Sequence, residues 1–151
     1  MAIENKDAAT PRGRVQADRR TRRLSRAAVV VFDSDRDDLE HLSILFEREG
    51  AEVRRATCAA DALALLRERL PDVVVSGLSL PVAEGLAFIS EVRRDPALQR
   101  VAAIAVTGSF TSRVAAEDAG FDRFLVKPVD EEELIGEMAR MLGVRRRAVG
   151  S

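Results

Sequence analysis

Polar side chains follow four of the short apolar runs in this sequence, and their types could bind an ion. Asp33, Ser34 and Asp35 follow the first run, and Lys127 follows the last. Carboxylate oxygens are ligands that Mg²⁺ prefers, whereas an ammonium group beside a hydroxyl group could hold a small anion. The other residues that follow such runs are Gly77, Ser79, Thr107, Gly108 and Pro128. What they can do depends on whether the fold brings them together.

Five short runs rich in β-branched residues alternate with stretches of helical period. The runs span residues 28–32, 52–55, 72–76, 101–106 and 121–126. We expect five helices after them, with a short fourth helix over residues 112–119 and a last helix that ends at Gly143. This alternation predicts an α/β fold with a parallel sheet and helical crossovers. The polar run at 52–55 suits an edge strand, and the apolar runs suit strands covered on both faces.

Composition predicts one domain with two basic tails. Residues 1–26 carry eight Lys or Arg against three Asp or Glu and have no apolar periodicity, so we expect a disordered arm. The domain then spans 27–143, and residues 144–151 form a tail with three consecutive arginines. The whole chain has a net charge of −1, so the body between the tails is acidic. There is no apolar stretch of membrane-spanning length and no secretion signal, which predicts a cytoplasmic protein with no membrane partner.

In an open parallel sheet, ligands bind beyond the carboxyl ends of the strands, near the point where the strand order reverses. The residues named above occupy those ends. Asp follows the first strand, Leu-Ser-Leu-Pro-Val-Ala-Glu-Gly follows the third, Thr follows the fourth and Lys-Pro follows the fifth. From 27 to 143 this order resembles the receiver domain of two-component signalling. The resemblance implies a flavodoxin-like, doubly wound sheet of five parallel strands in the order 2-1-3-4-5, with five helices.

In that family, an acidic pair after the first strand and an aspartate after the third hold Mg²⁺, and the latter aspartate accepts a phosphoryl group from a histidine kinase. The resemblance assigns the first acidic position to Asp33, the hydroxyl to Thr107, the ammonium to Lys127, the cis proline to Pro128 and the aromatic switch to Phe124. Two family residues are missing, because Ser34 stands at the second acidic position and Gly77 at the phosphoacceptor position.

A glycine offers no nucleophile, and neither Asp72 nor Glu84 can replace it, because each lies at the wrong end of its segment. We therefore expect no Mg²⁺ or other cofactor and a vestigial phosphorylation site, with Asp33 paired to Lys127. Asp35, Asp37 and Asp38 are interpreted as charges at a helix start. The lone Cys58 and the lone His41 are expected to have no catalytic role, and the protein is predicted not to be an enzyme.

The predicted function is that of a non-phosphorylatable receiver that acts in signal transduction through protein contacts. Its partner would be a histidine kinase or a downstream effector, and a homodimer is also compatible with the sequence. The expected partner face lies on the fourth helix, fifth strand and fifth helix and includes Arg113, Glu117, Asp118, Arg123, Glu132 and Glu133. Two alternatives stay open. One is a phosphorelay receiver modified at a replacement acceptor such as Ser79, and the other is a nucleic-acid accessory module that uses the arginine-rich tails.

Overall fold

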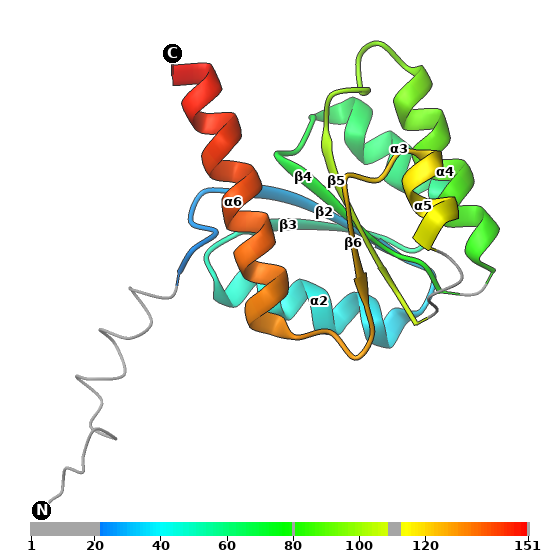
Figure 1. Cartoon of the computed structure of the whole chain (residues 1–151), viewed down its shortest axis with the longest axis horizontal. Helices are drawn as coiled ribbons and strands as arrows, with labels where there is room; N and C mark the ends of the chain where they lie inside the picture. The colour runs from blue at the N-terminus through cyan, green and yellow to red at the C-terminus, as the bar shows by residue number, and fades with distance from the viewer. Residues whose placement is uncertain (1–21, 80, 109–112, 151) are drawn as a thin grey trace, which may run out of the picture.

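The structure is a computed structural model, which describes residues 22–79, 81–108 and 113–150, with side chains described up to Gly143. Five strands and five helices alternate along these residues (Figure 1). The strands are β2 (Ala28–Asp33), β3 (Glu52–Ala56), β4 (Val73–Gly77), β5 (Ala102–Thr107) and β6 (Arg123–Val126). The helices are α2 (Arg36–Arg48), α3 (Ala59–Glu68), α4 (Val82–Arg94), α5 (Arg113–Ala119) and α6 (Glu131–Gly150). None of the described helices is long and apolar enough to cross a membrane.

All neighbouring strands are parallel, and the sheet order is β3-β2-β4-β5-β6. This is the order 2-1-3-4-5 in terms of the five strands, which confirms the predicted fold. The polar strand β3 lies at one edge, as expected. Strand order reverses between β2 and β4, and Asp33 at the end of β2 is in register with Gly77 at the end of β4.

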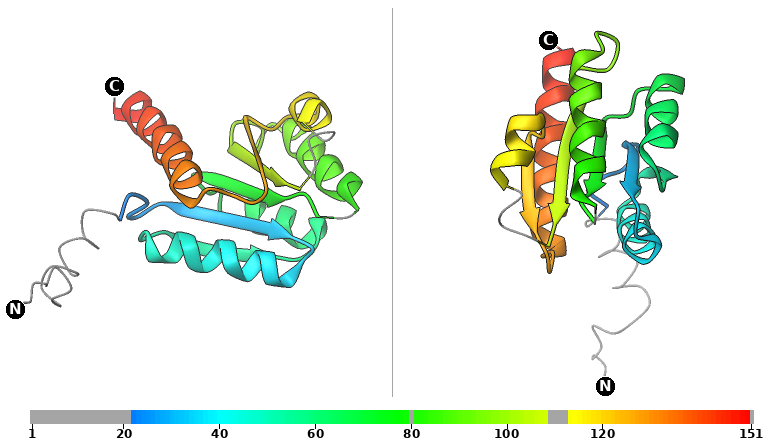
Figure 2. Two further views of the ribbon diagram at one scale, coloured as in Figure 1. Left: turned by 60° about the horizontal axis from the view of Figure 1, so that its bottom comes forward. Right: turned by 90° about the vertical axis from the view of Figure 1, so that its right-hand side faces the viewer.

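Side chains alternate between two apolar layers, one on each face of the sheet. Val29 and Val31 face α2 and α6, whereas Val30 and Phe32 face α3, α4 and α5. Helices therefore cover both faces (Figure 2). The layers explain why the central strands are apolar at nearly every position, since neither face of them meets water.

The packed part of the chain begins before Ala27. Leu24 is fully buried and belongs to the layer between the sheet, α2 and α6. Its backbone amide donates to the carbonyl of Glu49 at 3.0 Å, and Arg23 forms a 2.8 Å ion pair with Glu132. The expectation that the arm extends to residue 26 was therefore wrong at its end, because one isolated leucine in a basic stretch carries no periodic signal. Residues 1–21 lie outside the described residues.

Helix α6 does not end at Gly143 but continues to Gly150, and its last turns project beyond the sheet (Figure 1). Gly143 has helical backbone, and a glycine inside a helix costs only about 1 kcal/mol relative to alanine. The arginines that follow it are good helix formers. The predicted separate tail at 144–151 thus begins as a continuation of the helix.

Candidate functional site

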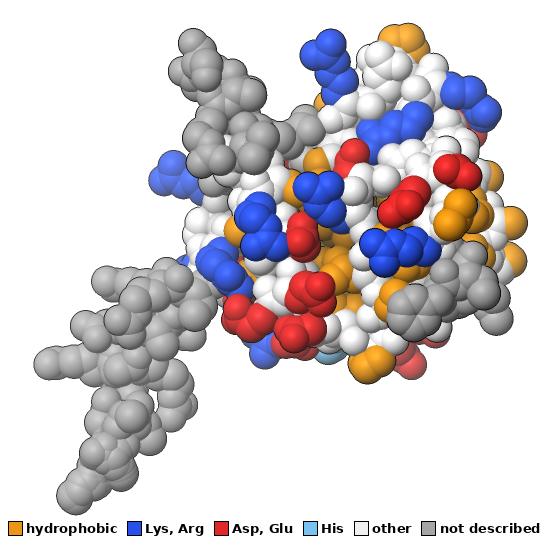
Figure 3. Space-filling model, in the orientation of Figure 1, with side chains coloured by type: hydrophobic (Ala, Val, Ile, Leu, Met, Phe, Trp, Pro, Cys, Tyr) orange, Lys and Arg blue, Asp and Glu red, His pale blue; other side chains and the backbone are white. Residues whose placement is uncertain are grey.

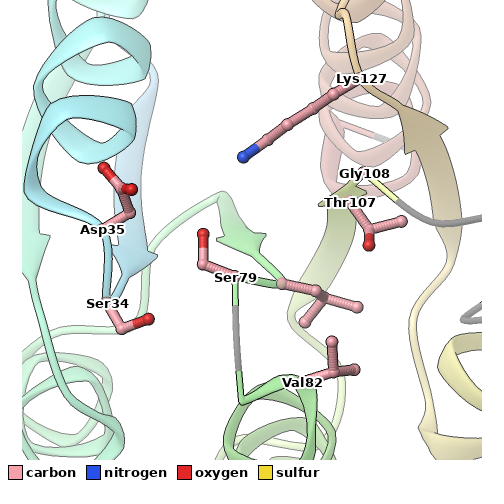
Figure 4. A pocket seen from close by; sticks show the side chains of 8 residues that line it. Ser34, Asp35, Ser79, Val82, Thr107, Gly108 and Lys127 are labelled. Atoms are coloured by element: carbon pink, nitrogen blue, oxygen red, sulfur yellow. The ribbon is translucent and has the colours of Figure 1, made fainter.

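The carboxyl ends of β2, β4, β5 and β6 border a pocket of about 620 Å³. Its lining comprises Ser34, Asp35, Leu78, Ser79, Val82, Thr107, Gly108 and Lys127. Figure 4 shows the Lys127 side chain reaching from the end of β6 toward the side of the pocket that carries Ser79 and Asp35. The fold thus brings together residues that are more than 90 positions apart in the sequence, such as Ser34 and Lys127.

Asp33 lies beneath this pocket and has no exposed surface. Its Oδ1 atom accepts a hydrogen bond from the Asp35 amide at 2.9 Å. The Ser79 hydroxyl is near the carboxyl group, but no donor among the described residues completes a hydrogen bond to Oδ2. Burial raises the pKa of Asp33 above its ordinary value, and the Asp35 amide, the Ser79 hydroxyl and the Lys127 charge offset this only in part.

The Asp33 carboxylate also lies over Gly77, its register partner on β4. A Cβ atom added to Gly77 would be 2.5 Å from Asp33 Cγ and closer still to Oδ2. Real Cβ atoms do not approach other heavy atoms so closely. Asp33 therefore occupies space that any side chain at position 77 would need, and the two residues are complementary in shape.

Lys127 forms its ion pair with Asp38 on α2, and the Nζ to Oδ2 distance is 2.5 Å. The expected ion pair with Asp33 was wrong. Asp33 is fully buried, whereas the Asp38 and Lys127 side chains keep 40% and 29% of their surface exposed. Pairing at Asp38 therefore leaves the lysine partly hydrated, which avoids the cost of burying its charge. Lys127 still lowers the pKa of Asp33 through its charge.

Thr107 is the last residue of β5, and its side chain is buried at the edge of the pocket. Its carbonyl accepts a 2.7 Å hydrogen bond from the Lys127 amide, which joins the ends of β5 and β6. The following peptide bond, Lys127–Pro128, is cis, the geometry that the family resemblance implies. The backbone at the ends of these two strands thus sets the positions of the hydroxyl and the ammonium.

The aspartates at the start of α2 act as expected for a helix start. The side chain of Asp35 accepts hydrogen bonds from the amides of Asp37 and Asp38 at 2.9 and 3.0 Å. This satisfies amide groups that the first turn of a helix leaves without a backbone partner. Asp38 has a second role, as the partner of Lys127, which no local pattern in the sequence indicates.

The donor set at the strand ends does not match that of a magnesium site. Mg²⁺ is usually held by carboxylate oxygens in near-octahedral geometry. Asp33 supplies one carboxylate, but Ser34 and Gly77 stand beside it where a second and a third would be needed. Across the described residues, no group of three His, Cys, Asp or Glu could hold a metal ion.

The residues of the expected partner face make contacts on α5, β6 and α6. The Arg123 side chain lies 3.1 Å from Glu137, and Arg113 stacks over the half-buried ring of Phe124 at 5.7 Å from its centroid. Glu117 lies 3.5 Å from Arg113, one turn along α5, and both are exposed. Helix α5, which carries Arg113, Glu117 and the exposed Asp118, packs beside the edge strand β6, which begins at Arg123.

Glu132 forms an ion pair with Arg23, and no contact among the described residues tests its place in the expected partner face. Five residues of α-helix rotate by about 500°, so Glu132 and Glu137 point about 140° apart. Glu133 is one turn before Glu137 and shares its side of α6. Glu132 and Glu133 are adjacent in sequence, but an α-helix separates the directions of neighbouring side chains by about 100°.

Several contacts have no signal in the sequence. Arg93 donates to the carbonyls of Gly120, Gln99 and Val101 at 2.6 to 2.8 Å and forms a 3.0 Å ion pair with Asp122. His41 is exposed and lies 3.3 Å from Glu131, consistent with a surface residue. Cys58 is half-buried at the start of α3. These contacts join segments distant in sequence, so only the fold could reveal them.

Comparison with known proteins identifies the family. The family model of the response regulator receiver domain matches residues 29–139. An uncharacterized 14.6 kDa protein of Leptolyngbya boryana is 39% identical over 114 residues, which are 74% of this chain and 87% of that protein. The transcriptional regulatory protein PrrA of Mycobacterium tuberculosis is 34% identical over 119 residues, which cover 79% of this chain. The match covers about half of PrrA, 50% of its length.

Among solved structures, a CheY-like response regulator receiver domain protein from Methanospirillum hungatei superposes with a TM-score of 0.71. It is 25% identical in sequence, and the alignment covers 82% of this chain and 99% of that protein. The family match, the sheet order and the arrangement of the strand ends agree with one another. This chain therefore belongs to the response regulator receiver domain family.

Proposed function

We propose that this receiver domain is not phosphorylated at the family position and that it acts through contacts with a signalling protein. The observation that carries the proposal is the pair formed by Asp33 and Gly77. Gly77 has no side chain to accept a phosphoryl group, and the Asp33 carboxylate occupies the space above it. A nucleophile at position 77 is thus absent, and its place is filled.

The charges around the pocket support the same proposal. An aspartyl nucleophile attacks phosphorus only when a cation screens the repulsion between two anions. Lys127 is held by Asp38, and the carboxylates near it do not form a set that suits Mg²⁺. A phosphate donor entering the pocket would meet Asp35 on the lining and Asp33 below it. These carboxylates disfavour the approach of an anion.

Without covalent phosphate, a change of conformation needs another source of free energy. Reversing a two-state population from 1:99 to 99:1 requires about 5.5 kcal/mol of differential binding. We propose that a protein partner supplies it, by binding one conformation better than the other. The exposed charged face with Arg113, Glu117 and Arg123 is the surface we assign to such a partner.

A second candidate, modification at Ser79, is favoured by one observation. Ser79 lines the same pocket as Thr107 and Lys127, and its hydroxyl lies near the Asp33 carboxyl group. A carboxylate with a raised pKa is a better proton acceptor than an ordinary one, and it could activate the hydroxyl. This candidate predicts a phosphoryl group that is lost when Ser79 is replaced.

Intact-protein mass spectrometry after incubation with Mg²⁺ and a small-molecule phosphodonor distinguishes the two candidates. We expect the natural chain to keep its mass and the double variant Ser34→Asp, Gly77→Asp to gain a phosphoryl group once Asp33 turns away. Ser79→Ala is the control in both backgrounds. A phosphoryl group on the natural chain that disappears in Ser79→Ala would replace our proposal by the second candidate.

A further inference from the structure

A second hollow shares Lys127 with the pocket described above, but its other lining residues are different. It is a groove of about 260 Å³ between α2 and the segment that joins β6 to α6. Leu42, Leu45 and Val106 are buried and form its apolar lining, together with Pro128 and Val129. Two ion pairs border it, one from Lys127 to Asp38 and one from His41 to Glu131.

Carboxylates gather on the first turns of the two helices that border this groove. Figure 3 shows acidic side chains clustered over the start of α6. The seven carboxylates that directly precede or belong to these first turns are Asp35, Asp37, Asp38, Asp130, Glu131, Glu132 and Glu133. Lys127 and Arg23 pair with two of them, so the surroundings of the groove keep an excess of negative charge. An occupant that is basic and carries an apolar side chain would match both properties.

The chain itself contains such a segment, and the residues that follow it contact the C-terminal end of α2 and Glu132 at the start of α6. Residues 1–21 include Lys6 and four arginines, and Val15 lies between Arg14 and the pair Arg19 and Arg20. The residues that follow them are already attached to this side of the molecule. Leu24 is buried between α2 and α6, the Arg23 amide donates to Glu49 at 3.1 Å, and the Arg23 guanidinium binds Glu132.

The length of the segment is sufficient. From Glu49, which Arg23 touches, to Asp38 at the far border of the groove is eleven helical residues, about 17 Å. The chain from Arg22 to Val15, seven residue steps, spans up to about 25 Å when extended. A tethered segment also has an effective concentration of about millimolar, so weak contacts are enough to seat it.

We propose that residues 12–21 dock in this groove, with Val15 against the apolar lining and the arginines beside the carboxylates of α2 and α6. Residues 12–21 would then compete with any protein partner that binds this groove. A protein partner that uses the groove must first displace the arm. The proposal goes beyond the function proposed above and holds whether or not any residue of the chain is phosphorylated.

The test is paramagnetic broadening in the full chain. A nitroxide is attached to the variant Ala17→Cys in a Cys58→Ser background, and the amide signals of the ¹⁵N-labelled protein are recorded. At about 0.01 M salt, where the Debye length is about 30 Å, we expect several-fold loss of intensity for amides of residues 38–45 and 129–133. At about 1 M salt the Debye length is about 3 Å, and the intensities should recover. Amides of α4 serve as the internal reference and should stay sharp.

Two comparisons make the result decisive. The pair Glu131→Gln and Glu132→Gln should weaken the broadening, whereas the matched pair Glu68→Gln and Glu91→Gln, which removes equal charge elsewhere, should not. A mixture of ¹⁴N protein that carries the spin label with ¹⁵N protein that does not carry it reports only contacts between chains, and it should show no broadening. Broadening in that mixture would assign the arm to a second copy and overturn the intramolecular contact. Uniform broadening, or none at low salt, would overturn the docking site itself.

Discussion

The carboxylate of Asp33 lies where a side chain of residue 77 would begin. Both residues end their strands and are in register, and only the absence of a Cβ atom at Gly77 lets the carboxylate take this position. Asp33 therefore fills the space beside the backbone of Gly77 that a side chain at this position would need. The consequences of that relationship can be measured.

Replacing Gly77 by alanine should destabilise the fold. The new Cβ atom collides with Asp33, and overpacking of a buried site costs about 1 to 3 kcal/mol. The free energy of unfolding, measured with denaturant, should fall by this amount. In an Asp33→Ala background the same change should cost much less, because the obstacle is gone. Gly108→Ala is the control, since nothing lies within 4 Å of its added Cβ atom. Additive effects of the two changes would contradict the contact.

Replacing Asp33 by asparagine should stabilise the protein at neutral pH. Burial raises the pKa of Asp33 in the folded state, so the folded chain binds the proton more tightly than the unfolded chain. Stability contributed by this group therefore falls as pH rises from the ordinary pKa to the raised one. We expect Asp33→Asn to be more stable than the natural chain at pH 7, because asparagine removes the buried charge whose desolvation raises the pKa of Asp33.

The gain should shrink as the pH falls toward the ordinary pKa of an aspartate, because the natural Asp33 then becomes neutral as well. Denaturant unfolding of both proteins across this range measures the difference, in which the titration of all other carboxylates cancels. A gain that stays constant with pH would show that charge burial is not its cause.

The ion pair between Lys127 and Asp38 should contribute little to stability. Both side chains are partly exposed, and exposed ion pairs typically contribute about 0.2 to 1 kcal/mol to the free energy of unfolding. A double-mutant cycle with Lys127→Met and Asp38→Asn should give a coupling free energy in this range that decreases with added salt. A coupling several times larger, or one unaffected by salt, would mean that the pair is better shielded from water than its exposed surface indicates.

Arg93 should be important for stability although it is far from the pocket. Its guanidinium binds three carbonyls and Asp122, which join the end of α4 to the starts of β5 and β6. Arg93→Lys keeps the charge but cannot reach all four acceptors, and we expect a loss of about 1 to 3 kcal/mol in thermal or denaturant unfolding. The exposed neighbour Arg94→Lys is the matched control and should change stability by less than about 0.5 kcal/mol.

Leu24 should behave as a core residue. Removing a buried leucine side chain costs about 2 to 5 kcal/mol, and Leu24→Ala should lower the free energy of unfolding within this range. Val114→Ala is the comparison, because Val114 is 68% exposed and should change stability by less than about 0.5 kcal/mol. A small effect at Leu24 would place the start of the packed domain after this residue.

The sheet order was predicted by the family resemblance, whereas local sequence patterns were sufficient for the edge position of β3 and the role of Asp35 at the start of α2. The last two depend on the polarity of a short strand and on a carboxylate beside free amides. Local patterns failed at Leu24 and at Gly143, where a single buried residue and a helical glycine are decided by neighbours that are distant in sequence or by the rest of the helix.

The sequence by itself determined which residues stand at the strand ends, and therefore that Gly77 supplies no carboxylate and Lys127 an ammonium group. Only the tertiary structure decided how these groups are arranged. In the folded chain, the Asp33 carboxylate lies over Gly77, and Lys127 forms its ion pair with Asp38. The side chains of Glu132 and Glu137 point in directions about 140° apart on α6. The physical reason is that side-chain pairing depends on burial and on distances of a few ångströms across elements, which are properties of the packed fold and leave no periodic pattern along the chain.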